Sequence, residues 1–185
     1  DYETQMEDRM NFLKDRRPTR QISVGEVKIG AGADIAGQSM TNTPTRDVAA
    51  TVEQIQKLAD AGCEIIRVAV PDEEAARAVS AIKERVGIPV IADIHFDHRL
   101  AVKAAESGAD GLRINPGNIG DPAKVGKVVE CAKYHAIPIR VGVNAGSLEK
   151  DIVRSFGTGP EAMAQSALRN IEVLEGFGFH DIKIS

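Results

Sequence analysis

The chain is organised as a repeat of short apolar segments that alternate with segments of helical periodicity. Strands are expected at residues 37–41, 64–70, 89–95, 111–116, 138–144 and 181–185. Most of them are separated by ~10–15 residues with helical spacing of apolar side chains, which is typical of βαβ units and a parallel sheet. Two folds have this pattern, a doubly wound open sheet and a (β/α)8 barrel.

Aspartates mark the starts of several expected helices. Asp72, Asp97 and Asp121 each precede a helical segment, where a carboxylate can accept a hydrogen bond from the first turn. Ahead of the repeat, an alternating stretch with a Gly-Glu turn predicts a β-hairpin over residues 21–29. Residues 1–20 are expected to form a mobile arm or a peripheral helix.

One face of the expected strands is polar. Side chains alternate between the two faces of a strand, and this alternation puts Arg67, Arg113, Arg140 and Lys183 on one face and apolar residues on the other. An open sheet covered by helices on both sides would be apolar on both faces. We therefore predict an α/β fold, a (β/α)8 TIM barrel truncated to about six βα units over residues 21–185, with an N-terminal β-hairpin.

The polar face carries an excess of positive charge. Four cations face one clear anion, Asp93, in a chain whose net charge is −4. Like charges repel in a low dielectric, so this cluster favours a multiply anionic ligand, and arginine binds phosphate or carboxylate in bidentate fashion. Backbone N–H groups of the loop at residues 117–120 would add donors for phosphate. Alternatively the arginines pair with carboxylates for structural reasons, and Asp93 can satisfy one of them.

The segment that follows Asp93 has two interpretations. Asp93, His95, Asp97 and His98 resemble a set of metal ligands, but only the first two share the interior face, so we assign no metal to this chain. Imidazole groups exchange protons near neutral pH. We therefore take His95 and Asp93 as the candidate catalytic residues, with His95 as a proton donor or a hydrogen-bond partner of the ligand.

Composition excludes several functional classes. Aromatic residues make up 4% of the chain and there is no dense basic run, which disfavours nucleic-acid binding. No apolar run approaches the ~20 residues that a membrane span needs. Cys63 and Cys131 have neither disulfide-framework nor metal-ligand spacing, so we expect buried, reduced thiols and a cytoplasmic protein.

Four motifs resemble the 4-hydroxy-3-methylbut-2-enyl diphosphate synthase family (IspG/GcpE). They are QSMTNT at 38–43, ADIHFD at 92–97, LRINPGNIG at 112–120 and RVGVNAGSLEK at 140–150. The resemblance runs from about residue 22 to residue 185. It implies a reductive ring opening of 2-C-methyl-D-erythritol 2,4-cyclodiphosphate, with two electrons and loss of water, to (E)-4-hydroxy-3-methylbut-2-enyl diphosphate in isoprenoid biosynthesis.

The resemblance also implies partners and a cofactor. In the family the barrel holds the diphosphate, while a C-terminal domain carries a [4Fe-4S] cluster on three cysteines and a glutamate. The enzyme is a homodimer that takes electrons from ferredoxin or flavodoxin. This chain has six expected strands and no cluster motif, so the cluster domain is expected to be absent and the chain alone inactive.

By motif position, the resemblance assigns site residues. It implies diphosphate and hydroxyl contacts from Arg67, Arg113, Arg140, Asn144 and Lys183. Asp93, His95 and Asn115 would orient these groups or the substrate, and residues 40–42 would lie beside the mouth. Two other functions stay open, namely a dihydropteroate synthase-like transferase and a non-catalytic anion-binding or assembly fragment.

Overall fold

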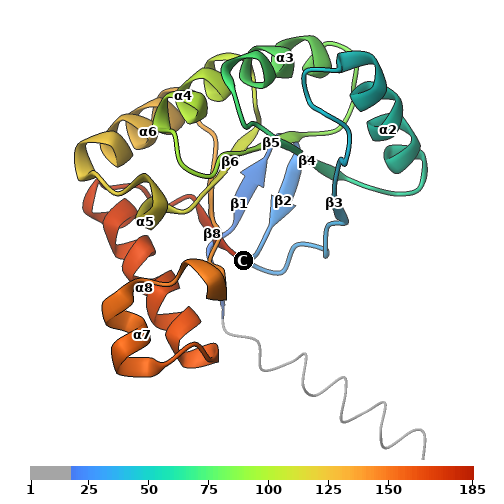
Figure 1. The fold of residues 1–185 in the computed structure, drawn as a ribbon. Coiled ribbons are helices and arrows are strands. Elements are labelled where there is room, and N and C mark those ends of the chain that lie inside the picture. Colours follow the sequence, from blue (N-terminus) through green and yellow to red (C-terminus); the bar gives the residue numbers. More distant parts are fainter. Residues whose placement is uncertain (1–17) are drawn as a thin grey trace, which may run out of the picture.

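The computed structural model describes residues 18–185, in which a curled parallel sheet is covered on its outside by helices (Figure 1). Residues 1–17, which include most of the predicted arm, lie outside the described part. The six strands are β3 (Gln38–Met40), β4 (Ile65–Ala69), β5 (Val90–Asp93), β6 (Gly111–Ile114), β7 (Ile139–Val141) and β8 (Ile182–Ile184). They pair in chain order and in parallel, which confirms the predicted partial barrel.

Helices connect consecutive strands and cover the outer face of the sheet. The longer ones are α2 (Val48–Asp60), α3 (Glu73–Lys83), α4 (His98–Glu106), α6 (Pro122–Tyr134) and α8 (Pro160–Gly176). The carboxylates of Asp72, Asp97 and Asp121 accept first-turn N–H groups of α3, α4 and α6, as predicted. Three short elements were not predicted, namely α5 (Pro116–Ile119), η1 (Ala145–Ser147) and α7 (Lys150–Phe156).

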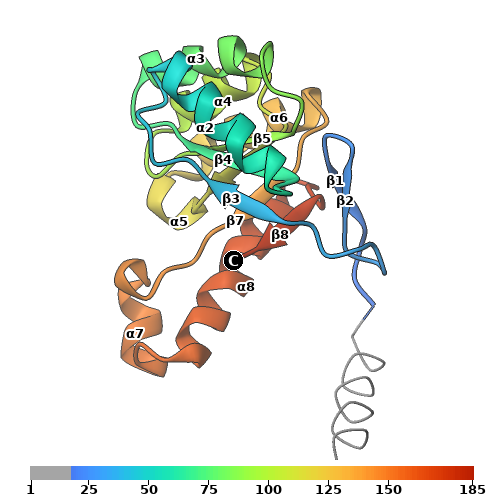
Figure 2. The ribbon, with the colours of Figure 1, turned by 90° about the vertical axis from the view of Figure 1, so that its right-hand side faces the viewer.

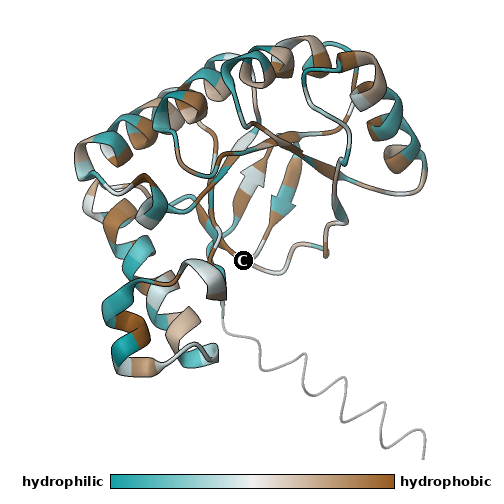
Figure 3. Cartoon of the chain, viewed as in Figure 1, coloured by the Kyte–Doolittle hydropathy of each residue, from teal (hydrophilic) through white to brown (hydrophobic). Residues whose placement is uncertain are grey.

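The main core lies between the outer face of the sheet and the helices. Alternate residues of the central strands point outward and are fully buried there, among them Ile66, Val68, Leu112, Ile114, Ile139 and Val141. Their helical partners are apolar on the facing side (Figure 3). The predicted apolar face is therefore confirmed, and the other face of each strand is turned toward the inside of the curl.

A hairpin closes one end of this interior. Strands β1 (Ile22–Val24) and β2 (Val27–Ile29) pair antiparallel around the predicted turn. Val24 packs with Ile65 and Ile91, which have the inward parity of the polar face. In Figure 2 the hairpin stands at the amino ends of the strands, on the side away from α5 and α7. The open end of the interior is therefore the end where the strands finish.

The sheet curls far enough for its first and last strands to meet through their inward side chains. Lys183 Nζ on β8 lies 3.5 Å from Gln38 Oε1 on β3. These two strands form the edges of the sheet. Among the helices of residues 18–185, none combines the length and the apolar character that crossing a bilayer requires.

Candidate functional site: a cationic barrel interior

Strand register assembles four charged residues into one row across the sheet. Asp93 pairs with Arg113, Arg113 with Arg140, and Arg140 with Lys183. Arg67 lies one inward position earlier on β4, since Ala69 is the residue opposite Asp93. The four cations predicted to share a face therefore do so, on the inward face of β4, β6, β7 and β8.

Asp93 joins three of the surrounding side chains. Its carboxylate, 4% exposed, lies 3.5 Å from Nε of Arg67, 3.3 Å from Nη1 of Arg113 and 3.5 Å from Nε2 of His95. The carboxylate of Asp93 is thus shared by two guanidinium groups, whereas the sequence analysis assigned only one arginine to it. Ion pairing within the protein accounts for part of the positive charge of Arg67 and Arg113, but only one negative charge serves both.

Arg140 and Lys183 have no carboxylate partner within residues 18–185. Burial, and then the charges of Arg67 and Arg113, lower the pKa of Arg140. Burial, and then Arg140 and Arg67, lower the pKa of Lys183 to about 8. Moreover, Nε of Arg113 and Nε of Arg140 are buried without a hydrogen-bond partner. Buried donors normally find acceptors, so these cations favour an anion between them.

Strand β3 contributes two neutral side chains to the same interior. Nε and Nη2 of Arg67 lie 3.2 and 3.1 Å from the Met40 sulfur, a weak acceptor. Gln38 faces Lys183 as described. Sequence reasoning placed Met40 beside the mouth but did not identify Gln38. Gln38 lies two residues before Met40 on the first strand and therefore shares its face, and this spacing could have identified Gln38.

The two predicted asparagines cap short helices at the open end. Asn115 Oδ1 accepts the N–H of Gly117 at 3.0 Å, and Asn144 Oδ1 accepts the N–H of Gly146 at 2.9 Å. Each side-chain oxygen is thereby occupied, and neither amide nitrogen makes a hydrogen bond within the described residues. Each asparagine therefore retains amide N–H groups that could contact a ligand.

The prediction that the loop at 117–120 supplies N–H donors to phosphate is wrong. This segment forms most of α5, and its N–H groups are already bonded within the protein. That of Gly117 is accepted by Asn115 and, at 2.8 Å, by Asn170. Those of residues 118–120 are accepted by the carbonyls of Asn115 and Pro116. A capping asparagine followed by proline at the first helical position starts a helix here, which consumes the donors.

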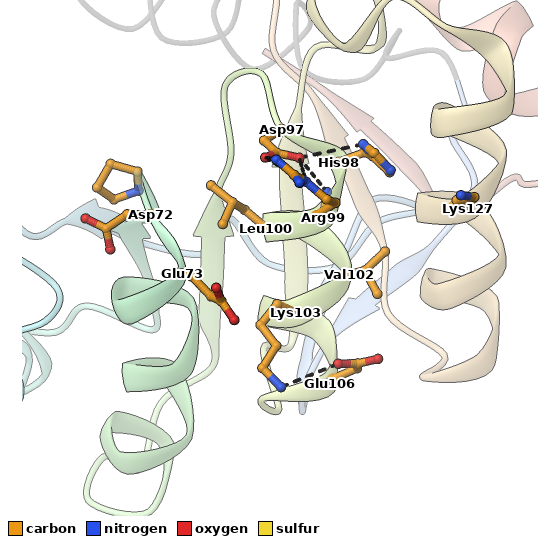
Figure 4. Close-up of a pocket in the computed structure, with 11 residues that line it drawn as sticks. Asp72, Glu73, Asp97, His98, Arg99, Leu100, Val102, Lys103, Glu106 and Lys127 are labelled. Carbon is orange, nitrogen blue, oxygen red and sulfur yellow. Dashed lines mark hydrogen bonds and ion pairs between the residues drawn. The ribbon is translucent and has the colours of Figure 1, made fainter.

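The predicted group of Asp93, His95, Asp97 and His98 is brought together only in part. Asp93, His95 and Asp97 line one small pocket, in which His95 is 59% exposed, and His98 is not among its residues. Asp97 also lines, with His98, an outer groove between α3 and α4, and hydrogen bonds from Arg99 lower the pKa of Asp97 to about 2 (Figure 4). Within residues 18–185, no three His, Cys, Asp or Glu side chains are arranged to hold a metal ion.

The cysteines do not fit the iron-sulfur cluster that the resemblance implies. Cys63 Sγ lies 3.1 Å from the carbonyl of Ile65, and Cys131 Sγ lies 3.8 Å from that of Val102. The sequence predicted buried thiols; both cysteines are partly buried, and both pack against the core. Two cysteines in such separate places do not form a cluster donor set.

Comparison with known proteins agrees with this geometry. Residues 19–185 match the model of the GcpE TIM-barrel domain. A 4-hydroxy-3-methylbut-2-en-1-yl diphosphate synthase (flavodoxin) from Caldanaerobacter subterraneus is 57% identical over 175 residues, which are 94% of this chain and 49% of that protein. The Desulfotalea psychrophila enzyme of the same name is 55% identical, over 92% of this chain and 48% of its own length. The chain thus spans about half the length of these relatives.

Solved structures share the fold at low sequence identity. The Yersinia pestis dihydropteroate synthase superposes on this chain with a TM-score of 0.63 at 11% identity. The match includes 89% of this chain and 61% of that synthase. The Vibrio fischeri dihydropteroate synthase has the same TM-score at 14% identity, and the match includes 90% of this chain and 66% of that enzyme. Such identities establish the barrel architecture alone, whereas the family match extends through every strand of the cationic interior. The chain belongs to the GcpE family and consists largely of its TIM-barrel domain.

Proposed function

We propose that this barrel is the substrate-binding domain of a 4-hydroxy-3-methylbut-2-enyl diphosphate synthase. The substrate would be 2-C-methyl-D-erythritol 2,4-cyclodiphosphate, whose ring is opened with two electrons and loss of water to (E)-4-hydroxy-3-methylbut-2-enyl diphosphate. The observation that carries the proposal is the row of Arg113, Arg140 and Lys183 with unpartnered donors at the open end. Guanidinium and ammonium groups in register are suited to a diphosphate.

The individual side chains then have distinct roles. Arg140 and Lys183, which have no carboxylate partner in the described residues, would contact the diphosphate most directly. Asp93 holds Arg67 and Arg113 from one side and leaves their remaining N–H groups for the ligand. The amide nitrogens of Asn115 and Asn144 would bind oxygens at the rim. His95, exposed beside Asp93, is the residue of this chain placed to deliver or hold a proton at the mouth.

Electron transfer requires groups that this chain does not provide. In the proposed enzyme residues outside this chain would hold a [4Fe-4S] cluster, which would pass the donor's electrons to the substrate one at a time. Flavodoxin, which the relatives' names specify, is the proposed donor, with ferredoxin as the alternative. We further propose a cytoplasmic homodimer in which a cluster domain closes over the open end, and no turnover by these 185 residues alone.

Calorimetric titration tests the binding part of this proposal. The chain should bind the cyclodiphosphate and inorganic diphosphate, and Arg140→Met should weaken both. Arg169→Met is the matched control, because Arg169 pairs with Asp151 on the surface of α7 and α8. Tighter binding of a pterin diphosphate than of the cyclodiphosphate would instead support a dihydropteroate synthase-like transferase. If the chain binds neither the cyclodiphosphate nor inorganic diphosphate, the proposal is overturned.

A further inference from the structure

Gly142 occupies a position where the backbone does not require glycine. It directly follows β7, is buried, and shares the inward parity of Arg140. Its N–H donates to the carbonyl of Ile114 at 2.9 Å, which continues the parallel ladder. Its φ lies outside the left-handed region that favours glycine. A side chain here would therefore cause no backbone strain.

The space beside Gly142 is filled by the guanidinium group of Arg113. A Cβ atom at position 142 would overlap Nε, Cζ and Nη2 of that arginine. The end of an arginine side chain is flexible, so the guanidinium group would move rather than the strand. Arg113 would then leave its place 3.3 Å from Asp93, and its buried Nε would change surroundings.

We propose that Gly142 is a positioning residue for Arg113. The missing side chain leaves a slot over the β7 backbone, and this slot sets the direction in which the guanidinium group enters the barrel interior. Asp93 fixes one Nη atom, and the slot fixes the plane in which the rest of the group can lie. The consequence for anion binding rests on the proposed function, whereas the slot itself does not.

Gly111 provides a matched control on the adjacent strand. It also has inward parity and is buried, but it lies at the closed end of the interior. A Cβ there would stand 3.4 Å from the carbonyl oxygen of Pro138 and 3.6 Å from Cγ1 of Ile91, in ordinary contact. Gly111→Ala therefore adds the same methyl group to the same face without reaching Arg113.

Arginine side-chain NMR tests the slot without any ligand. The Nε–Hε signal of Arg113 is identified by its loss in Arg113→Met. We expect Gly142→Ala to shift or abolish that signal and Gly111→Ala to leave it in place. An unchanged signal in folded Gly142→Ala would overturn the proposal. If Gly142→Ala does not fold, Gly142→Ala with Arg113→Ala should fold, because the side chain that meets the added methyl group is gone, and failure of both would also overturn it.

Binding of inorganic diphosphate tests the consequence. Gly142→Ala should raise the dissociation constant for diphosphate by about 10- to 100-fold, because the displaced guanidinium group of Arg113 would no longer direct its charge-assisted hydrogen bonds at the ligand. In an Arg113→Ala background the same change should cause no further loss, because no side chain remains at position 113 to meet the added methyl group. An equal loss in both backgrounds would overturn the positioning role. If the unaltered chain does not bind diphosphate, the proposed function fails, while the NMR comparison still decides the role of Gly142.

Discussion

The two ends of the barrel interior use the same strand faces for opposite purposes. At the closed end, Ile65 and Ile91 pack against Val24 of the hairpin. Two residues further along the same strands, Arg67 and Asp93 form a charged site. A two-residue step is only about 6.6 Å along a strand. Strand alternation decides which side chains enter the interior, and position along the strand decides whether they stabilise the fold or remain available for a ligand.

Ile65→Ala should have the largest effect and should act on the closed end alone. Ile65 is 1% exposed, and removing a buried isoleucine side chain costs about 2–5 kcal/mol of unfolding free energy. Urea unfolding measures this loss, and titration of the folded variant should show diphosphate affinity close to that of the unaltered chain. A large loss of affinity in the folded variant would show that the two ends are not separable.

Arg113→Met should act mainly on the open end. Loss of a buried charge-assisted contact is expected to weaken diphosphate binding by about 2–5 kcal/mol. Isothermal titration gives the value directly. A change below about 0.5 kcal/mol would mean that Arg113 serves only as a structural partner of Asp93.

Arg140→Met sharpens the distinction between stability and binding. Arg140 is disfavoured by burial and by two neighbouring cations, so its replacement should leave the ligand-free chain equally stable or more stable by roughly 1 kcal/mol. Diphosphate binding should weaken nonetheless. Urea unfolding with and without diphosphate checks both signs, and destabilisation of the ligand-free chain would contradict the expectation.

The pH dependence of binding should identify Lys183. With a pKa of about 8, its ammonium form prevails at pH 7 and is lost by pH 9, so its contribution to diphosphate affinity should vanish over that range. Comparison with Lys183→Met removes the ligand's own titration. Stability of the ligand-free chain should change in the opposite direction. The pKa of Lys183 in the folded chain lies below its ordinary value of 10.5, so the unfolded chain binds more protons and stability rises as the pH increases from about 8 to 10.5. Parallel affinity profiles for the two proteins would exclude this role.

Arg99→Ala should have the smallest effect. Arg99 belongs to the outer groove and is bound to Asp97 (Figure 4). Solvent screens such an exposed pair, and Arg99 is paired with Asp97 rather than with a residue of the cationic interior. Diphosphate affinity, measured by titration, should therefore be unchanged. A clear loss would move the anion site from the interior to the groove.

Much of the fold was predictable because it depends on local patterns. Strand parity placed Arg67, Arg113, Arg140 and Lys183 on one face, and the aspartate caps located three helix starts. The elements that were missed also carried local signals. Asn115 followed by Pro116 is a helix start, and α7 ends at Gly157, whose φ is 72°.

Other features depend on how strands are paired, which local patterns do not reveal. Asp93 contacts both Arg67 and Arg113 because β5 lies between β4 and β6. A Cβ atom at position 142 would meet Arg113 only because β6 and β7 adopt their observed register. Likewise, the second acceptor of the Gly117 N–H group is Asn170, 53 residues away, and no local pattern places it beside α5.

The hairpin at the closed end has a consequence for how the chain folds during synthesis. Val24 leaves the ribosome 41 residues before Ile65 and 67 residues before Ile91. At about 5–20 residues per second the second partner follows roughly 3–13 s later, and an isolated two-stranded hairpin is marginally stable at best. We expect chains that end after β3, released from the ribosome so that the hairpin lies outside the exit tunnel, to be cleaved at residues 22–29 by added protease, and released chains that extend well past α4 to resist. Equal resistance of both would show that the hairpin forms before the strands on which it packs.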